Sequence, residues 1–112
     1  MRLSDLEPFK QVPFYFWAKD ANGVYVWGST PMDRFAGGTV VGRTDADFGP
    51  EAETLSTAAT LRANDQSVLE SGQPLFTHER IEGAGNVSVC KWAGELDGQP
   101  VTFGLSFLVP GD

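Results

Sequence analysis

Hydrophobic residues concentrate in two short runs near the start of the chain, and a polar turn separates them. The runs cover about residues 13–19 and 24–28, and aromatic and β-branched side chains dominate both. Such side chains suit the pleated, half-buried surface of a sheet. The dipeptide Asn22-Gly23 supplies the positive backbone angles that a tight turn needs. The pattern therefore predicts a β-hairpin.

Two helices are predicted after this hairpin. Ser29 or Thr30 can cap a short helix that Pro31 begins and Gly37-Gly38 ends. The second helix covers residues 51–71, which contain no Gly or Pro, and Gly72 ends it. Residues 39–50 between the two helices are expected to form a loop with a brief turn. The clearest apolar stripe of the second helix consists of Ala58, Leu61, Val68 and Leu69, and Asp65 falls on the same stripe.

Three further strands are predicted, at about residues 75–82, 87–95 and 101–109. Residues 83–86 and the dipeptide Asp97-Gly98 have the composition of hairpin connections. Two strands, then helices, then three strands indicate an α+β fold with helices on one face of a five-stranded antiparallel sheet. The last strand alternates bulky residues with the smaller Thr102, Gly104 and Ser106. The smaller face leaves room for a ligand or a close helix, and the bulky face can bury residues 1–12 or a second subunit.

A chain of 112 residues predicts one domain over residues 13–112, preceded by a cap segment at residues 1–12. Leu3, Leu6 and Phe9 can share one face of that segment, and Pro8 limits its helical length. The net charge of −7 argues against direct nucleic-acid contact. The sequence contains no apolar run of membrane-spanning length and no signal-peptide pattern at its start, so a cytoplasmic location is expected.

Four motifs in order resemble the PAS sensor family, and together they cover nearly the whole chain. The segment WAKDANGVYVWGSTPMDRF is similar to the family's opening strand, turn, strand and helix. VVGRTDADF resembles the loop before the long helix, LRANDQSVLESGQPLFTHERI resembles the end of that helix and the third strand, and KWAGELDGQPVTFGLSF resembles the last hairpin. Ser29 departs from the Asn of many members, and Pro110-Gly111 would interrupt a helix leading to an output domain.

The resemblance implies a PAS-like, profilin-like architecture with a pocket between the sheet and the helices. It also implies signal transduction: a sensor that binds a small molecule or dimerises to regulate a kinase, a cyclase or a transcription regulator, in some cases within a two-component system. Catalytic activity is not expected. Residues 1–12 and the outer sheet face are the expected homodimer surface. The ligand, the signal and the output partner stay open.

Haem, flavin and metal sites are not expected, and the cofactor stays unknown. His78, the only histidine, falls in a predicted strand, whereas haem-binding relatives place their ligand on the long helix. Cys90, the only cysteine, excludes an internal disulfide and lacks the helix motif of flavin-adduct relatives. It is interpreted as a small buried residue.

Acidic residues in the loop and the long helix leave alternatives open. Asp45 and Asp47 are interpreted as turn and capping residues rather than a metal or acid/base pair. Asp65 is expected at the solvent edge, or paired with a donor such as Arg62.

A ligand pocket is expected to be apolar with a few polar anchors. The expected pocket residues are Trp27, Phe35, Leu61, Asn64, Phe76, Cys90, Trp92, Thr102 and Gly104. Two alternatives to a ligand sensor remain: a pure protein–protein interaction module, and a small α+β pocket enzyme.

Overall fold

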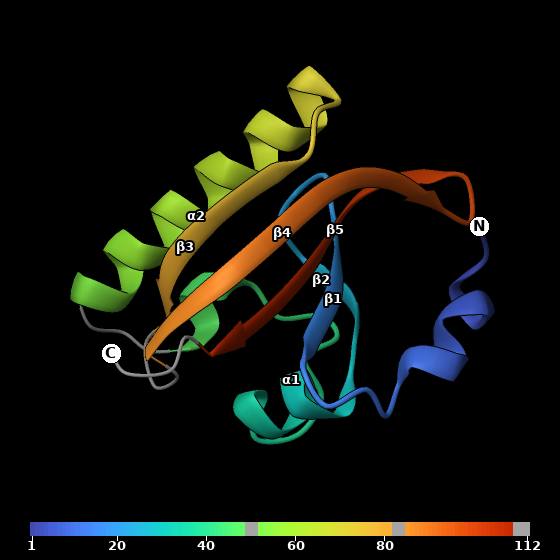
Figure 1. Cartoon of the computed structure of the whole chain (residues 1–112), viewed down its shortest axis with the longest axis horizontal. Coiled ribbons are helices and arrows are strands. Elements are labelled where there is room, and N and C mark those ends of the chain that lie inside the picture. The colour runs from blue at the N-terminus through green and yellow to red at the C-terminus, as the bar shows by residue number, and fades with distance from the viewer. Residues whose placement is uncertain (49–51, 82–84, 109–112) are drawn as a thin grey trace.

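Five antiparallel strands form one sheet in a computed structural model of the chain, which describes residues 1–48, 52–81 and 85–108 (Figure 1). The spatial order of the strands is β2-β1-β5-β4-β3, so the first strand lies beside the last. The elements in chain order are η1 (Leu3–Phe9), β1 (Tyr15–Asp20), β2 (Tyr25–Gly28), α1 (Thr30–Ala36), η2 (Asp45–Phe48), α2 (Ala52–Ser71), β3 (Leu75–Ile81), β4 (Gly85–Leu96) and β5 (Gln99–Leu108).

The predicted α+β class and the order of its elements are confirmed. Asp20 closes the first hairpin because its Oδ1 accepts hydrogen bonds from the backbone N–H groups of Asn22 and Val24, at 2.8 and 3.0 Å. In the last hairpin Asp97 and Gly98 both have positive φ, 49° and 81°, as a two-residue turn of this kind requires. The expected helix start at residue 51, the loop residues 83–84 and the strand end at residue 109 lie outside the described residues.

The short helix α1 is attached to the start of the sheet through Ser29. Ser29 occupies the N-cap position of α1, but its side chain makes no cap hydrogen bond. Its Oγ instead accepts from the Phe16 N–H at 3.1 Å and donates to the Phe14 carbonyl at 3.0 Å. Gly37, at φ 75°, ends α1 as predicted.

The register separates two faces of the sheet. Because residues directly opposite one another share a face, the inner face carries Trp17, Lys19, Val89, Lys91, Thr102 and Gly104. Helix α1 contacts β1 and β2, and α2 contacts β3, β4 and β5. Trp17, Tyr25 and the two inner-face valines Val87 and Val89 belong to a buried cluster with Met32, Ala36 and Val40.

The smaller face of β5 differs from the expectation at Gly104. A Cβ on Gly104 would overlap the indole ring of Trp17. The side chain of Trp17, directly opposite on β1, therefore fills the space that the glycine leaves. Glycine is needed here because of this close approach.

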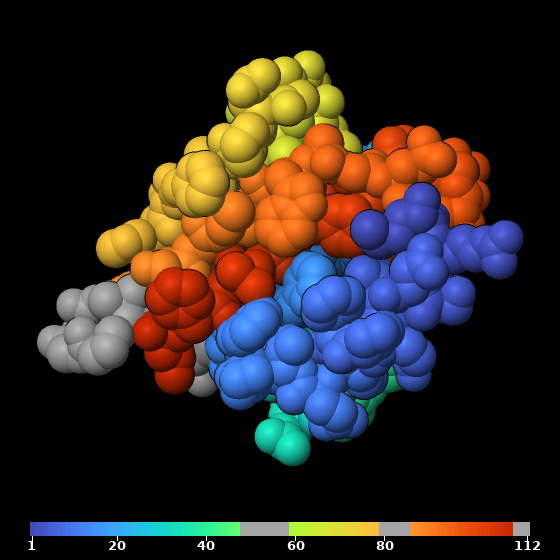
Figure 2. Space-filling view, turned by 45° about the vertical axis from the view of Figure 1, so that its right-hand side comes forward, coloured from blue at the N-terminus to red at the C-terminus, as the bar shows by residue number. Residues whose placement is uncertain are grey.

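The outer face is covered at one end by the N-terminal segment, defined as residues 1–12. Leu6 of this segment, 2% exposed, packs in a cluster with Trp27 and Phe103. The segment is attached at both ends: the Met1 carbonyl accepts from the Asp97 N–H at 2.9 Å, and Lys10 Nζ donates to the Gly28 carbonyl and Asp33 Oδ2. Figure 2 shows this segment in blue against the orange and red strands β4 and β5.

Candidate functional site

Five polar side chains meet between the inner sheet face and the helices, and we call them the buried polar cluster: Lys19, Tyr25, Asp45, Asp65 and Lys91. Lys19 Nζ donates to Asp45 Oδ2 at 2.6 Å and to Asp65 Oδ2 at 2.8 Å. Lys91 Nζ donates to Asp65 Oδ1 at 2.9 Å. The Tyr25 hydroxyl donates to Asp45 Oδ1 at 2.6 Å. Three strands, η2 and α2 therefore share one hydrogen-bonded network.

Almost no part of this network touches solvent. The side chains of Lys19, Lys91 and Asp65 are 1%, 0% and 2% exposed, whereas that of Asp45 is 10% exposed. Asp45 is therefore the member nearest to solvent.

Strand alternation explains how two lysines reach the interior. Lys19 lies opposite Thr102 and Lys91 lies opposite Gly104, so both occupy inner-face positions. Asp65 lies four residues after the buried Leu61 and three before the buried Val68, on the helix stripe that faces the sheet.

Charge pairing is what makes this burial tolerable. Moving a charged group out of water costs several kcal/mol unless close partners compensate. Burial by itself lowers the pKa of Lys19, but the negative charges and hydrogen bonds of Asp45 and Asp65 outweigh it and raise that pKa above 10.5. Lys19 is therefore a protonated donor at neutral pH.

Two polar atoms near the cluster lack partners among the described residues: Trp17 Nε1 and Thr102 Oγ1. Both residues are buried, at 5% and 0% exposure, and both lie on the inner face. An unsatisfied buried polar group costs about 1–3 kcal/mol, so such groups are candidates for bonds to a ligand.

Solved structures with a similar fold include a LuxR-type receptor and PAS domains. VqmA of Vibrio cholerae, solved as a dimer without its target DNA, is 21% identical with a TM-score of 0.71, and the match covers 99% of this chain and 54% of VqmA. The PAS domain of BvgS from Bordetella pertussis is 13% identical with a TM-score of 0.70, and the match covers 98% and 87% of the two chains.

This chain has a PAS-like fold.

A PAS domain of an HTR-like protein from Haloarcula marismortui is also similar, at 22% identity and a TM-score of 0.60, covering 95% and 90% of the two chains. No family model matches the chain, and no curated protein matches it by sequence. The chain spans 50–58% of the length of the VqmA chains that it matches.

The expected pocket residues of this PAS-like domain fall on both faces of the sheet. Thr102 and Gly104 lie on the inner face, and Leu61 is a buried residue of α2. Asn64 is half-buried on α2, and Phe35 lies on α1 with its ring 6.3 Å from that of Tyr15. The remaining four lie on the outer face and so do not line the space between sheet and helices: Trp27, Phe76, Cys90 and Trp92.

Sequence reasoning missed Lys19, Tyr25 and Lys91, and it misplaced Asp65. The expectation that Asp65 lies at the solvent edge is wrong, because the carboxylate is buried between two lysines. The alternative that it pairs with a donor is right, but Lys19 and Lys91 take the place of Arg62. Arg62 instead donates to the Ala21 carbonyl at 2.8 Å. An acidic residue on an apolar helix stripe, together with lysines at inward strand positions, was the signal available.

Asp45 and Asp47 have different roles although they are two residues apart. Asp47 Oδ2 accepts from the Thr44 N–H at 2.8 Å, as expected for a turn residue. Asp45 instead joins the buried polar cluster, so its interpretation as a turn residue alone is wrong.

The remaining chemistry-bearing residues lie away from the cluster. His78 is exposed on β3 and Cys90 is half-buried on β4, both on the outer face. Burial raises the pKa of the Cys90 thiol, which disfavours its reactive thiolate. Within the described residues, no group of three or more His, Cys, Asp or Glu side chains is arranged to hold a metal ion.

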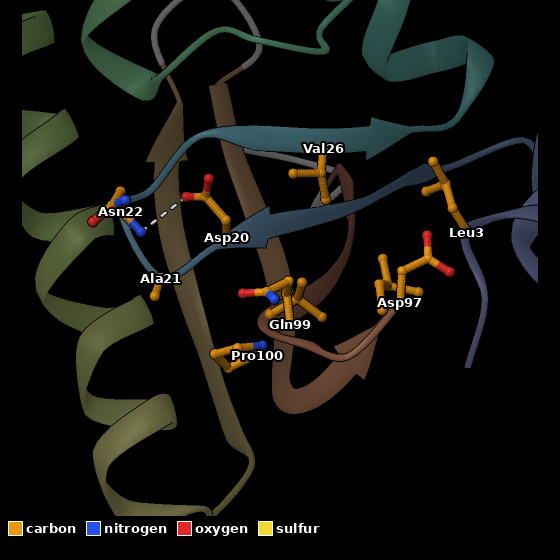
Figure 3. A pocket seen from close by; sticks show the side chains of 10 residues that line it. Leu3, Asp20, Ala21, Asn22, Val26, Asp97, Gln99 and Pro100 are labelled. Atoms are coloured by element: carbon orange, nitrogen blue, oxygen red, sulfur yellow. Dashed lines mark hydrogen bonds between the residues drawn. The ribbon is translucent and has the colours of Figure 1, made fainter.

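Residues within the described part of the chain line two hollows on the molecular surface. One, of about 370 Å³, lies between the start of the N-terminal segment and the two hairpin turns (Figure 3). One of the two aspartates that line it, Asp20, is already bonded to the turn that it closes. The other is an outer-face groove of about 410 Å³ lined by residues that include Phe76, Cys90 and Phe107.

Proposed function

We propose that this PAS-like domain is a sensor that binds a small molecule between the inner sheet face and α2, at the buried polar cluster. The observation that carries the proposal is a charged, hydrogen-bonded interior beside two polar atoms that bond no described residue, Trp17 Nε1 and Thr102 Oγ1. Ligand pockets commonly combine an apolar lining with a few polar groups that fix orientation. Binding there would shift the population of states that the helices occupy relative to the sheet.

The similar structures support this class of function. Structures of VqmA include a ligand–DNA complex and a form bound to DPO, and the work on the dimer without target DNA concerns LuxR-type receptors. We propose a comparable role here: a cytoplasmic, non-catalytic domain that regulates a kinase, a cyclase or a transcription regulator. The net charge of −7 favours a protein output partner over direct contact with nucleic acid. None of the described helices is both long enough and apolar enough to cross a bilayer.

The test is mass spectrometry of small molecules released when protein purified from cells is denatured. Lys91→Met removes a buried charge that bonds Asp65 in the cluster, and we expect it to abolish retention of the ligand. Arg34→Met removes one positive charge from an exposed position on α1 and serves as the matched control. Repeated absence of any released molecule from the wild-type protein would contradict the sensor function.

A second function, homodimerisation, is favoured by the apolar outer face beyond the N-terminal segment. Phe76 and Phe107 are 74% and 54% exposed there. An exposed apolar stripe of this kind marks an association site. Leu3 and Phe9 of the N-terminal segment, 40% and 46% exposed, would extend the surface.

Sedimentation equilibrium tests the dimer. Phe107→Ser is expected to weaken association at least about tenfold, since burying a Phe contributes about 1.5–3 kcal/mol. Val41→Ser changes an apolar residue that is also exposed, at 50%, but lies in the loop after α1. A wild-type protein that stays monomeric at high concentration would rule out the dimer and leave the sensor function intact.

A further inference from the structure

We propose that Asp45 occupies the place of a ligand's carboxylate, so that the ligand of the buried polar cluster is a small monoanionic carboxylic acid that displaces Asp45. This inference rests on the proposed sensor function and specifies the chemistry of the same site. It names both the ligand class and the group that must move.

Two donors converge on Asp45 as they would on a bound anion. Lys19 Nζ and the Tyr25 hydroxyl each lie 2.6 Å from one of its carboxylate oxygens. These are short, charge-assisted or strongly polarised hydrogen bonds, and each uses a separate oxygen. A carboxylate from another molecule offers the same two oxygens in the same geometry.

Asp45 is also the carboxylate that is easiest to displace. It belongs to the four-residue η2, and its side chain is the most exposed of the buried polar cluster. Asp65 contrasts with it: this residue lies well inside the 20-residue α2 and bridges two lysines. An incoming anion would therefore replace Asp45 and leave Asp65 in position.

Charge balance selects a monoanion. Asp45 places one negative charge beside Lys19, and both side chains are at least nine-tenths buried. If Asp45 moves out, the site loses that negative charge beside the ammonium group of Lys19, which is costly in a desolvated site. One carboxylate restores the balance, whereas a neutral amide does not.

The unpartnered atoms provide for a second polar group on the same ligand. Thr102 lies directly opposite Lys19 across the β1–β5 pair, which places their Cβ atoms about 4.5–5.5 Å apart. Its Oγ1 is buried and bonds no described residue. Trp17 Nε1, on the same face, is also buried and bonds no described residue. A hydroxyl or carbonyl on the ligand would satisfy them.

Displacement of Asp45 would also convert ligand binding into a structural change in η2. η2 contacts α2, so moving η2 changes what the long helix packs against. The freed carboxylate would move to solvent, where its charge is hydrated. Ligand binding is then linked to a shift in the region that joins α1 to α2.

Chemical rescue tests the proposal, with acetate, butyrate and benzoate as the probe anions and their amides as neutral controls. Asp45→Asn keeps the shape of the side chain but removes its charge, so the variant should be less stable than wild type. We expect the carboxylates to raise its melting temperature and to bind it at least about tenfold more tightly than wild type, as close charge pairs in interfaces imply. The amides should do neither.

Matched variants make the outcome specific. Asp47→Asn, two residues away in the same η2, should behave like wild type, and adding Tyr25→Phe to Asp45→Asn should weaken carboxylate binding.

If Asp45→Asn folds only when butyrate is present, the proposal is supported; if it stays unfolded with every carboxylate, the proposal is overturned. Equal binding of butyrate by wild type and Asp45→Asn, or equal effects of butyrate and butyramide, also overturns it. A neutral molecule released from the wild-type protein on denaturation would then leave the sensor function standing without the displaced Asp45.

Discussion

Two buried lysines set the chemistry of the interior at the scale of single residues. Lys19 places its ammonium group 4.9 Å from the ring centre of Tyr25, and its charge is shared between Asp45 and Asp65. Replacing a buried ion pair by apolar residues is often neutral or stabilising, so stability alone is a weak reason for such a cluster. Stability alone therefore does not account for the cluster, whereas the ligand recognition proposed above would.

The raised pKa of Lys19 predicts how stability depends on pH. A group that holds its proton more tightly when folded stabilises the fold fully below its unfolded pKa of 10.5, and this contribution is lost as pH rises through the higher folded value. The stabilising effect of Asp45 requires charged Lys19. The difference in unfolding free energy between wild type and Asp45→Asn should therefore be constant at neutral pH and shrink above pH 10.5.

Urea denaturation between about pH 9 and pH 12 measures this difference. Asp47→Asn controls for the loss of an η2 carboxylate outside the cluster. A difference that stays constant through the whole range would show that Asp45 does not act through the charge of Lys19.

Gly104 gives a second prediction at this scale. An added methyl group would overlap the Trp17 indole, so Gly104→Ala must push that ring out of a packed position. Overpacking of this kind costs about 1–3 kcal/mol, measurable as a lower urea midpoint. Gly38→Ala, where nothing lies within 4 Å of the added Cβ, is the control and should be neutral or slightly stabilising. Equal effects of the two changes on stability would mean that the Trp17 ring can move aside without destabilising the fold.

Ser29 shows how one side chain joins elements. Its Oγ bonds both the N–H of Phe16 and the carbonyl of Phe14, and its own N–H donates to the Phe16 carbonyl at 2.8 Å. The start of α1 is thereby attached to the start of β1. The residue is 0% exposed, so water cannot replace these bonds.

Ser29→Ala is therefore expected to destabilise the fold by about 1–3 kcal/mol, the cost of leaving buried partners unsatisfied. Chemical denaturation measures the change. Ser67→Ala, on the exposed side of α2, removes a hydroxyl of the same kind and should change stability by less than about 0.5 kcal/mol. A loss at Ser29 no larger than that at Ser67 would show that the two hydrogen bonds contribute nothing net.

The elements themselves were largely predictable, because turn chemistry is local. The Asp97-Gly98 turn and the Gly37 helix end follow from backbone angles that few residues adopt, and both lie where the pattern placed them. The face that each strand residue occupies depends on register with distant strands. That is why Trp92 was expected at the pocket and lies on the outer face, while Lys91 beside it reaches the interior.

At the scale of the whole molecule, the sheet is buried on both faces by different parts of the chain. The helices cover the inner face, and the N-terminal segment covers one end of the outer face. Long-range pairing of this kind has no signal in a local pattern. The candidate site illustrates the limit: it combines β1, β2, β4, η2 and α2, and its only signals in the sequence were an acidic residue on an apolar helix stripe and lysines at inward strand positions.

The N-terminal segment should behave as a separately opening unit, because a few side chains attach it to the sheet. Leu6 is the buried residue of the segment, so Leu6→Ala is expected to free the segment while the sheet stays folded. Hydrogen exchange should then accelerate at Asp5 and Lys10, whose amide groups bond within the segment, and not in the β4–β5 pair. Tryptophan fluorescence should also shift to the red as Trp27 loses its contact with the segment and becomes exposed to water.

Leu3→Ala changes the same residue type at a 40% exposed position and should leave both readouts near wild type. If exchange accelerates equally in β4 and β5, the segment and the sheet unfold together, and the outer face is part of one indivisible core.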